Sequence, residues 1–273
     1  MPLDLSVIIT SYNSSSTLSD TIESLLRLNP DETPKEIIVV DNASSDGSAD
    51  IAQSFPELQV LRSTVNQGLA TANNRGAEIS TGRSLLFLNP DTEILPGALN
   101  TLMKFEETHP DAGLLGPAML DSTDTVLSTA RTFPTLIDIM LRRTLLGKLP
   151  GTQAQQRKHL FSAEMNNPSR TDWLVGAALW LTGSGRKEFG LMSPKYFLYF
   201  EDVEWCFRAH KAGMEVWFVP DAVIKHACRR ESAGKPGKAL WFHLRSMVRF
   251  FIEHPSVAIG KHKASWNKKD RLI

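Results

Sequence analysis

The feature that most constrains the fold of this chain is an alternation of short apolar runs with helix-spaced segments. Runs typical of buried strands occupy residues 5–9, 36–40, 58–61 and 84–88. Between the first two, apolar residues recur at helical spacing from Leu18 to Leu26, and a second helix is expected over about 67–79. Strands that alternate with helices form a parallel, helix-covered sheet. The sequence therefore predicts an α/β fold.

Polar segments follow three of the predicted strands directly, at residues 10–13, 41–47 and 89–93. Ligands of open α/β sheets bind outside the carboxyl ends of the strands, so we expect these segments to share one rim. Pro90 forces the chain out of the sheet beside Asp91, whose carboxylate is suited to a divalent cation. Two other interpretations stay open. Asp91 could cap the helix expected near Pro96, and residues 41–47 could form a turn that binds no ligand.

A second polar group lies beyond about residue 111, where the alternation is looser. Glu201 and Asp202 follow the aromatic run 196–200, and desolvation beside such a wall raises a carboxyl pKa toward that of a general base. The alternative interpretation is that both acids only favour a helix dipole at its N-terminus. His226 follows a strand-like stretch, and a lone histidine is more often structural than a ligand.

Composition narrows the class of protein. Of the 273 residues, 42% are hydrophobic and 22% are charged, as in ordinary globular proteins, and the zero formal net charge argues against a dedicated nucleic-acid binder. Cys206 and Cys228 show no paired-thiol motif, the N-terminus lacks a basic signal region, and the apolar run 173–182 is too short to cross a bilayer. We therefore expect a cytoplasmic protein. Residues 131–167 include a Gln-, Lys- and Asn-rich stretch that is expected to form a mobile loop.

The C-terminal part of the chain is basic. From residue 235 onward, nine Lys or Arg stand against two acids, which favours either an anionic partner or a solvated helix with a frayed end. Residues 241–251 predict an amphipathic helix. It either lies on the inner face of the cell membrane or packs on the core with its arginines reaching water.

These segments, taken in order, resemble glycosyltransferase family two. SVIITSYN (6–13) and VVDNASSDGS (39–48) are similar to the opening of that family. Its rhamnosyltransferase-type branch is matched by residues 66–68, 72–76 and 87–92. FEDVEWCFR (200–208) resembles the acceptor-side acidic motif, and residues 219–226 match the segment after it. The blocks cover most of the chain from residue 5 to about 255.

The resemblance implies a GT-A type fold, a mostly parallel twisted sheet with helices on both faces. It implies a single domain over 1–273, made of a nucleotide-sugar-binding half (about 1–112), an acceptor-side half (about 113–255) and a basic tail (about 256–273). It also implies a nucleotide-sugar donor and inversion at the anomeric carbon.

The resemblance assigns expected roles to individual residues. The donor is expected to be held by Thr10, Tyr12 (near the base), Asp41, Asn66, Asn74, Asn89, Asp91, Gly176 and Ala177. Asp91 would ligate Mg²⁺ or Mn²⁺ with the donor diphosphate, and His226 would be a further ligand. Asp202 would be the general base, with Glu201 beside it. Two segments depart from the broad family: Asn89 replaces an acid in the metal motif, and glycines occupy residues 183 and 185, where a bulkier helix start is usual.

The predicted function is that of an inverting glycosyltransferase in cell-surface polysaccharide and cell wall synthesis. The branch favours rhamnose from dTDP-rhamnose, with UDP-sugars as the alternative donors. The expected acceptor is a glycan, free or linked to a polyprenyl diphosphate at the membrane. A nucleotidyltransferase is an alternative, although residues 10–16 lack the usual Gly- and Lys-rich phosphate loop. A catalytically silent nucleotide-sugar-binding protein is another, although it would be expected to lose Glu201 and Asp202.

Overall fold

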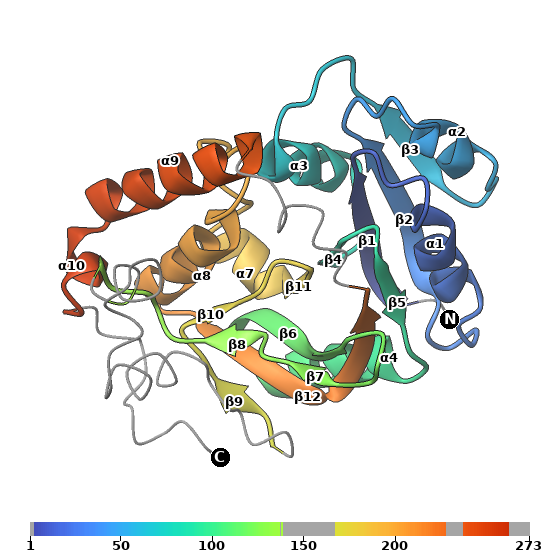
Figure 1. Cartoon of the computed structure of the whole chain (residues 1–273). Coiled ribbons are helices and arrows are strands. Elements are labelled where there is room, and N and C mark those ends of the chain that lie inside the picture. Colours follow the sequence, from blue (N-terminus) through green and yellow to red (C-terminus); the bar gives the residue numbers. More distant parts are fainter. Residues whose placement is uncertain (1–2, 137, 139–166, 228–236, 262–273) are drawn as a thin grey trace.

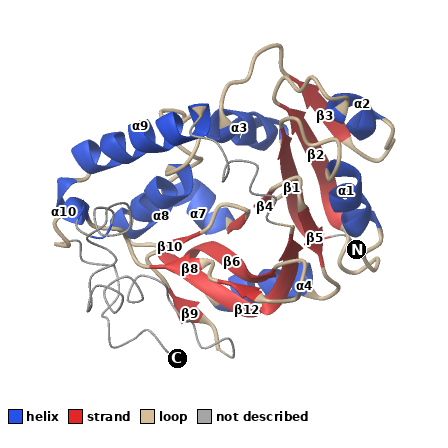
Figure 2. Cartoon of the chain, in the orientation of Figure 1, coloured by secondary structure: helices blue, strands red, loops and turns tan. Residues whose placement is uncertain are grey.

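The computed structural model describes residues 3–136, 138, 167–227 and 237–261 (Figure 1). Its centre is one large sheet whose main strand order is β3-β2-β1-β4-β11-β6-β12-β5. Figure 2 shows helices against both sides of this sheet. Most of the loop predicted within 131–167, Cys228 and the end of the basic tail lie outside the described residues.

The first half of the chain alternates strands and helices as predicted. The strands are β1 (Leu3–Ser11), β2 (Pro34–Asp41), β3 (Gln59–Arg62) and β4 (Ser84–Leu88). The helices are α1 (Leu18–Leu26), α2 (Ser48–Gln53) and α3 (Leu69–Ile79). β1 pairs in parallel with both β2 and β4, and β2 pairs in parallel with β3. The sequence pattern did not predict α2, which is short and follows a polar turn.

The second half contributes shorter strands and a mixed pairing. Its elements are β5 (Thr92–Ile94), α4 (Ala98–Thr108), β6 (Ala112–Leu120), β7 (Val126–Leu127), β8 (Ala130–Arg131), β9 (Ser169–Arg170), β10 (Trp173–Leu174), β11 (Ala178–Leu181), α7 (Gly183–Glu188), α8 (Glu201–Lys211), β12 (Glu215–His226), α9 (Lys238–Glu253) and α10 (Pro255–Ala258). β11 is antiparallel to both β4 and β6, whereas β12 is parallel to β6 and antiparallel to β5. The sheet is thus parallel from β3 to β4 and mixed beyond.

Two hydrophobic clusters cover the two faces of the sheet. Along β1, Leu5, Val7 and Ile9 pack with residues of α1, α2 and α4. Ile8 points to the other face and packs with residues of α3, α8 and α9. Each fully buried aliphatic side chain of this size contributes about 1.5–3 kcal/mol through removal from water. The predicted α/β fold with helices on both faces is therefore confirmed.

β5 follows β4 in the sequence but lies at the far edge of the sheet. Three strands from later in the chain, β11, β6 and β12, lie between them. The halves expected at about 1–112 and 113–255 consequently share one sheet. Among the described residues, no helix combines the length and the apolar character needed to cross a bilayer.

Candidate active site

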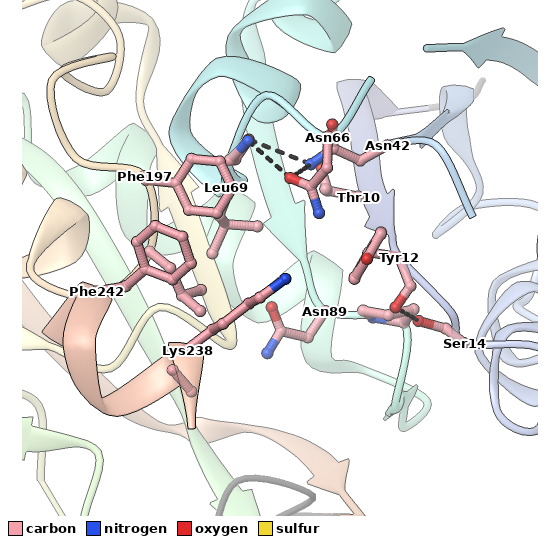
Figure 3. Close-up of a pocket in the computed structure, with 14 residues that line it drawn as sticks. Thr10, Tyr12, Ser14, Asn42, Asn66, Leu69, Asn89, Phe197, Lys238 and Phe242 are labelled. Atoms are coloured by element: carbon pink, nitrogen blue, oxygen red, sulfur yellow. Dashed lines mark hydrogen bonds between the residues drawn. The ribbon is translucent and has the colours of Figure 1, made fainter. Parts of the chain in front are cut away.

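A cavity of about 550 Å³ opens at the carboxyl ends of β1, β2 and β4 (Figure 3). It is lined by Thr10, Tyr12, Ser14, Asn42, Asn66, Gly68, Leu69, Asn89, Pro90, Phe197, Leu198, Lys238, Ala239 and Phe242. The shared rim expected for the polar segments is therefore present, and four of the expected donor-binding residues line the cavity.

An amide network fixes one wall of this cavity. The side-chain amide of Asn42 donates to Asn66 Oδ1 (3.0 Å) and to the Gly68 carbonyl (3.4 Å), and Asn42 Oδ1 accepts from the Gln67 N–H (2.9 Å). Asn66 Oδ1 also accepts from the Gly68 N–H (2.9 Å). Gly68 has φ +86° and an added Cβ would lie 2.5 Å from the Phe197 carbonyl oxygen, so only glycine fits there. The loop is held in place before a ligand arrives.

The end of β1 offers one buried and one exposed side chain to the cavity. The Thr10 hydroxyl donates to Asn73 Oδ1 over 2.6 Å, a buried bond between β1 and α3. Tyr12 is 51% exposed. An exposed aromatic ring at a cavity rim can stack on a flat ligand group such as a nucleobase.

Asp41 and Asn74 are not among the residues that line the cavity. Asp41 is buried next to Asn42; its Oδ2 accepts from the Ser44 N–H (3.1 Å), and its Oδ1 has no hydrogen-bond partner among the described residues. A buried carboxylate oxygen without a donor is costly, and a ligand N–H would satisfy it. Asn74 instead donates to the Met192 carbonyl (2.7 Å) and ties α3 to the segment before Phe197.

Asp91 and His226 meet in a smaller neighbouring cavity of about 170 Å³. His226 Nε2 lies 3.2 Å from Asp91 Oδ1, because β12 runs antiparallel to β5 and pairs His226 with Thr92. The described residues contain no cluster of three or more His, Cys, Asp or Glu side chains suited to a metal. A carboxylate beside an imidazole fits Mn²⁺ at least as well as Mg²⁺, with the other ligands supplied by water or a bound phosphate.

Asp91 does not cap a helix. α4 begins at Ala98, and its first N–H groups are bound by a distant acid: Glu32 accepts from the Gly97 N–H (2.8 Å) and the Leu99 N–H (2.9 Å). The helix-cap interpretation of Asp91 is therefore wrong, since Gly97 is the N-cap of α4 and Glu32 accepts from N–H groups at this helix start. This contact joins residues far apart in sequence, and no local pattern signals it.

The acidic pair begins α8 after two residues with left-handed backbone, Tyr199 (φ +66°) and Phe200 (φ +67°). Non-glycine residues in this region carry strain that often accompanies functional sites. Asp202 Oδ2 accepts from the Gly176 N–H (3.0 Å) and its Oδ1 from the Val203 N–H (2.8 Å). The acids thus lie at a helix N-terminus, as the alternative interpretation stated, and one of them also faces Gly176.

The two carboxyl groups have different environments. Glu201 is 4% exposed and its Oε2 has no partner among the described residues. Burial raises the pKa of Glu201 to about 8, and the negative charge of Asp202 adds to this effect. Burial also raises the pKa of Asp202, but the N–H groups of Val203 and Gly176 and the charge of Arg131 oppose it. The pair is therefore suited to hold one proton on Glu201 while Asp202 ionises.

Gly176 and Ala177 connect the acidic pair to the large cavity. The Ala177 carbonyl accepts from the N–H of Asn89, which lines the cavity (2.9 Å), while Gly176 binds Asp202. A Cβ at Gly176 would lie 3.3 Å from both Cβ and Oδ2 of Asp202. Gly176 and Ala177 therefore link Asp202 to the cavity-lining Asn89 through two hydrogen bonds, and the short contact with Asp202 favours glycine at position 176.

The glycines at 183 and 185 have a packing role. A Cβ on Gly185 would lie 2.5 Å from the Gly113 carbonyl oxygen, and one on Gly183 would lie 2.8 Å from Arg83 Cγ. Thr182 caps α7 by accepting from the Gly185 N–H (2.9 Å). Close packing of α7 against β6 accounts for this departure from the family pattern.

Phe197, Lys238 and Phe242 are among the cavity-wall residues that the expected donor-binding set did not include. Phe197 and Phe242 stack with ring centroids 4.3 Å apart, and Lys238 is the one charged side chain among the lining residues. Figure 3 shows Lys238 extending between Phe242 and Asn89. The aromatic run before Glu201 pointed to Phe197. No signal in the sequence indicated that α9 returns to this rim.

The model of glycosyl transferase family 2 matches residues 6–163, more than half of the chain. The chain belongs to this family. It is therefore a glycosyltransferase, as predicted.

Relatives of known name support the branch as well. The chain is 29% identical to the N-acetylglucosaminyl-diphospho-decaprenol L-rhamnosyltransferase of Mycobacterium tuberculosis over 240 residues, which cover 82% of this chain and 77% of that protein. It is 26% identical to the rhamnosyltransferase WbbL of Escherichia coli K12 over 243 residues, which cover 85% and 88%. The predicted resemblance to the rhamnosyltransferase-like branch is confirmed.

Solved structures share the fold. GalNAc-T7 with UDP, GalNAc and Mn²⁺ superposes with a TM-score of 0.64 at 18% identity, covering 97% of this chain and 52% of that one. This chain thus spans about half of GalNAc-T7. Staphylococcus aureus TarS 1-349 in complex with UDP gives a TM-score of 0.56 at 16% identity, covering 92% and 72%. The predicted GT-A fold is confirmed.

Proposed function

We propose that this protein is an inverting glycosyltransferase that moves a sugar from a nucleoside diphosphate to a hydroxyl of a glycan acceptor in polysaccharide synthesis. The observation that carries the proposal is the backbone link from the cavity wall, through Asn89, Ala177 and Gly176, to Asp202. It sets a partly exposed carboxylate beside a cavity large enough for a nucleotide sugar. The rhamnosyltransferase relatives support dTDP-rhamnose as the donor.

The nucleoside is assigned to the rim formed by β1 and β2. Tyr12 stacks on the base, and the unpaired Oδ1 of Asp41 accepts the N–H of a pyrimidine such as thymine or uracil. Thr10 and Asn66 complete this wall. Asn74 is placed behind it, where it orients α3.

The donor diphosphate lies toward Asn89, Lys238 and the Asp91–His226 pair. Asp91 and His226 would hold Mn²⁺ or Mg²⁺, which supplies Lewis-acid stabilisation of the leaving diphosphate. Asn89 contributes an amide where a second carboxylate is usual, so the site carries less negative charge. Lys238 adds a positive charge near the leaving group.

Transfer is a single displacement. The acceptor oxygen forms a bond to the anomeric carbon as the bond from that carbon to the diphosphate oxygen breaks, and the diphosphate leaves with the electron pair. Asp202 takes the proton of the acceptor hydroxyl. Glu201 stays protonated near neutral pH because burial raises its pKa to about 8, so Asp202 ionises without a second charge beside it.

The acceptor is a glycan linked to a polyprenyl diphosphate on the inner face of the cell membrane, with the enzyme in the cytoplasm and in peripheral contact with that membrane. The relative named for a diphospho-decaprenol acceptor supports this choice. The two alternatives differ in support. Membership of the glycosyltransferase family argues against a nucleotidyltransferase, and retention of Glu201 and Asp202 argues against a silent binding protein.

Thermal unfolding with a panel of nucleoside diphosphates tests the donor site, because a ligand that binds only the native state raises its apparent stability. We expect dTDP to stabilise more than UDP or GDP, and Mn²⁺ to increase the effect. Asp91→Asn should lose the Mn²⁺ increment and keep the response to dTDP alone. Absence of any response to all three nucleotides would contradict the donor site, and stabilisation without turnover of dTDP-rhamnose on any lipid-linked acceptor would favour the silent protein.

A further inference from the structure

Helix α9 lies along the outside of the molecule (Figure 1), and one of its faces is apolar and exposed. Its five exposed apolar side chains, each between 39% and 74% exposed, are Leu240, Trp241, Leu244, Val248 and Ile252. Four of them recur every fourth residue, and at 3.6 residues per turn all five fall in a sector of roughly 120°. An exposed apolar face of this kind marks a site where the protein contacts another molecule or a membrane.

The opposite face anchors the helix. Phe250 is fully buried and packs against Phe200 and Phe207 with ring centroids 5.5 and 6.0 Å apart. The Ser246 hydroxyl donates to the Leu198 carbonyl over 3.0 Å. The exposed face is therefore fixed in orientation by the core beneath it.

Cations gather at one edge of the apolar face. Lys195, Arg245 and Arg249 line a cavity of about 180 Å³ beside Phe197 and Phe242. A single acid, Glu253, contacts Lys195 (3.2 Å) and Arg249 (3.6 Å). The Arg245 guanidinium lies 5.3 Å from the centre of the Trp241 ring, and no carboxylate among the described residues pairs with it. The edge keeps a net positive charge.

We propose that the exposed face of α9, bounded by Lys195, Arg245 and Arg249, docks the protein on an anionic lipid surface. An apolar sector with cations along its border and a tryptophan at the boundary has the layout of a helix that lies in a membrane interface. The apolar side chains enter the acyl boundary while the cations meet lipid phosphates. A second copy is the poorer occupant, because a two-fold contact through this face would bring the same cations together.

This inference deepens the proposed function, since Lys238 and Phe242 of the same helix line the donor cavity. Docking through α9 would hold the cavity next to the layer that contains a lipid-linked acceptor. Lipid binding itself is measured without donor or acceptor, so it can fail while the glycosyltransferase proposal stands.

Sedimentation of the full chain with vesicles tests the docking surface. We expect binding to vesicles of equal parts phosphatidylcholine and phosphatidylglycerol, weaker binding to phosphatidylcholine alone, and loss of the difference at high salt. Val248→Ser with Ile252→Ser should weaken binding on the order of tenfold or more. Arg245→Gln should weaken binding to the anionic vesicles only.

Val126→Ser on β7 is the matched control, because Val126 is 40% exposed and Val248 is 52% exposed. It should leave vesicle binding unchanged. All variants should keep their unfolding temperature and their stabilisation by dTDP, which separates loss of docking from loss of the fold or of the donor site. The proposal is overturned if the parent chain binds neither vesicle, if Val126→Ser weakens binding as much as Val248→Ser, or if the face holds a dimer that Val248→Ser dissociates.

Discussion

The buried acid at the start of α8 makes the stability of this protein depend on pH in a specific direction. The pKa of Glu201 is about 8 in the folded protein, whereas an unperturbed glutamate has 4.5. Between these values the folded state binds more protons than the unfolded state, so the free energy of unfolding falls as pH rises. Glu201→Gln removes this titration and leaves a side chain of the same shape.

The size of the effect follows from the two pKa values. One pKa unit corresponds to 1.36 kcal/mol, so full ionisation of Glu201 costs at most about 5 kcal/mol. Among the described residues the Oε2 of Glu201 has no hydrogen-bond partner, so an amide there gains no bond and carries a pH-independent cost of about 1–3 kcal/mol. We expect Glu201→Gln to be less stable than the parent near pH 5 and more stable by about 2–4 kcal/mol near pH 9.

Urea unfolding monitored by tryptophan fluorescence, from pH 5 to pH 9, measures this difference. Glu253→Gln serves as the control: despite partial burial, hydrogen bonds from Lys195 and Tyr196 hold the pKa of Glu253 below its usual value. Its loss should therefore give no gain at high pH. A stability difference between Glu201→Gln and the parent that stays constant with pH would refute the reasoning.

Three further substitutions test the site. Asp202→Asn should lower turnover by on the order of a hundred- to ten-thousand-fold and leave stabilisation by dTDP unchanged; near-parental turnover would remove Asp202 from the role of base. Gly176→Ala places a Cβ 3.3 Å from Asp202, which should displace the carboxylate and lower kcat about tenfold without changing donor binding. An unchanged kcat would show that the displaced carboxylate still works. Lys238→Met should weaken dTDP binding about tenfold or more in titration calorimetry, and Lys187→Met on the surface should not.

Local patterns predicted the strands that consist of short runs of apolar residues. Residues 5–9 and 84–88 lie in β1 and β4, and the polar segments after them reach one rim, as the rule for open sheets requires. β6 was missed because Gly and Pro interrupt the apolar run in AGLLGPAML, yet the strand is buried in the sheet. Pairing with β11 and β12 stabilises β6, although its residues have a low intrinsic β-propensity.

Local sequence and family resemblance indicated some residues of the candidate site and not others. Asp91 and His226 were both expected to ligate a metal, and the structure brings them within 3.2 Å of each other. Lys238, Phe242 and the capping residue Glu32 came from contacts between distant parts of the chain, which no local pattern encodes.

The place of β5 has a consequence for synthesis of the protein. β5 emerges from the ribosome directly after β4, but its neighbour β12 is made only when residues 215–226 have followed. Until then β5 is held from one side, by the Thr21 hydroxyl on the Thr92 carbonyl (2.7 Å) and by the Ser24 hydroxyl that accepts from the Ile94 N–H (3.1 Å).

The Asp91–His226 contact is therefore among the last to form in the nascent chain. A transcript truncated before codon 226 would yield a polypeptide that contains the rim residues of β1, β2 and β4. It would lack His226, and with it one of the two candidate cation ligands.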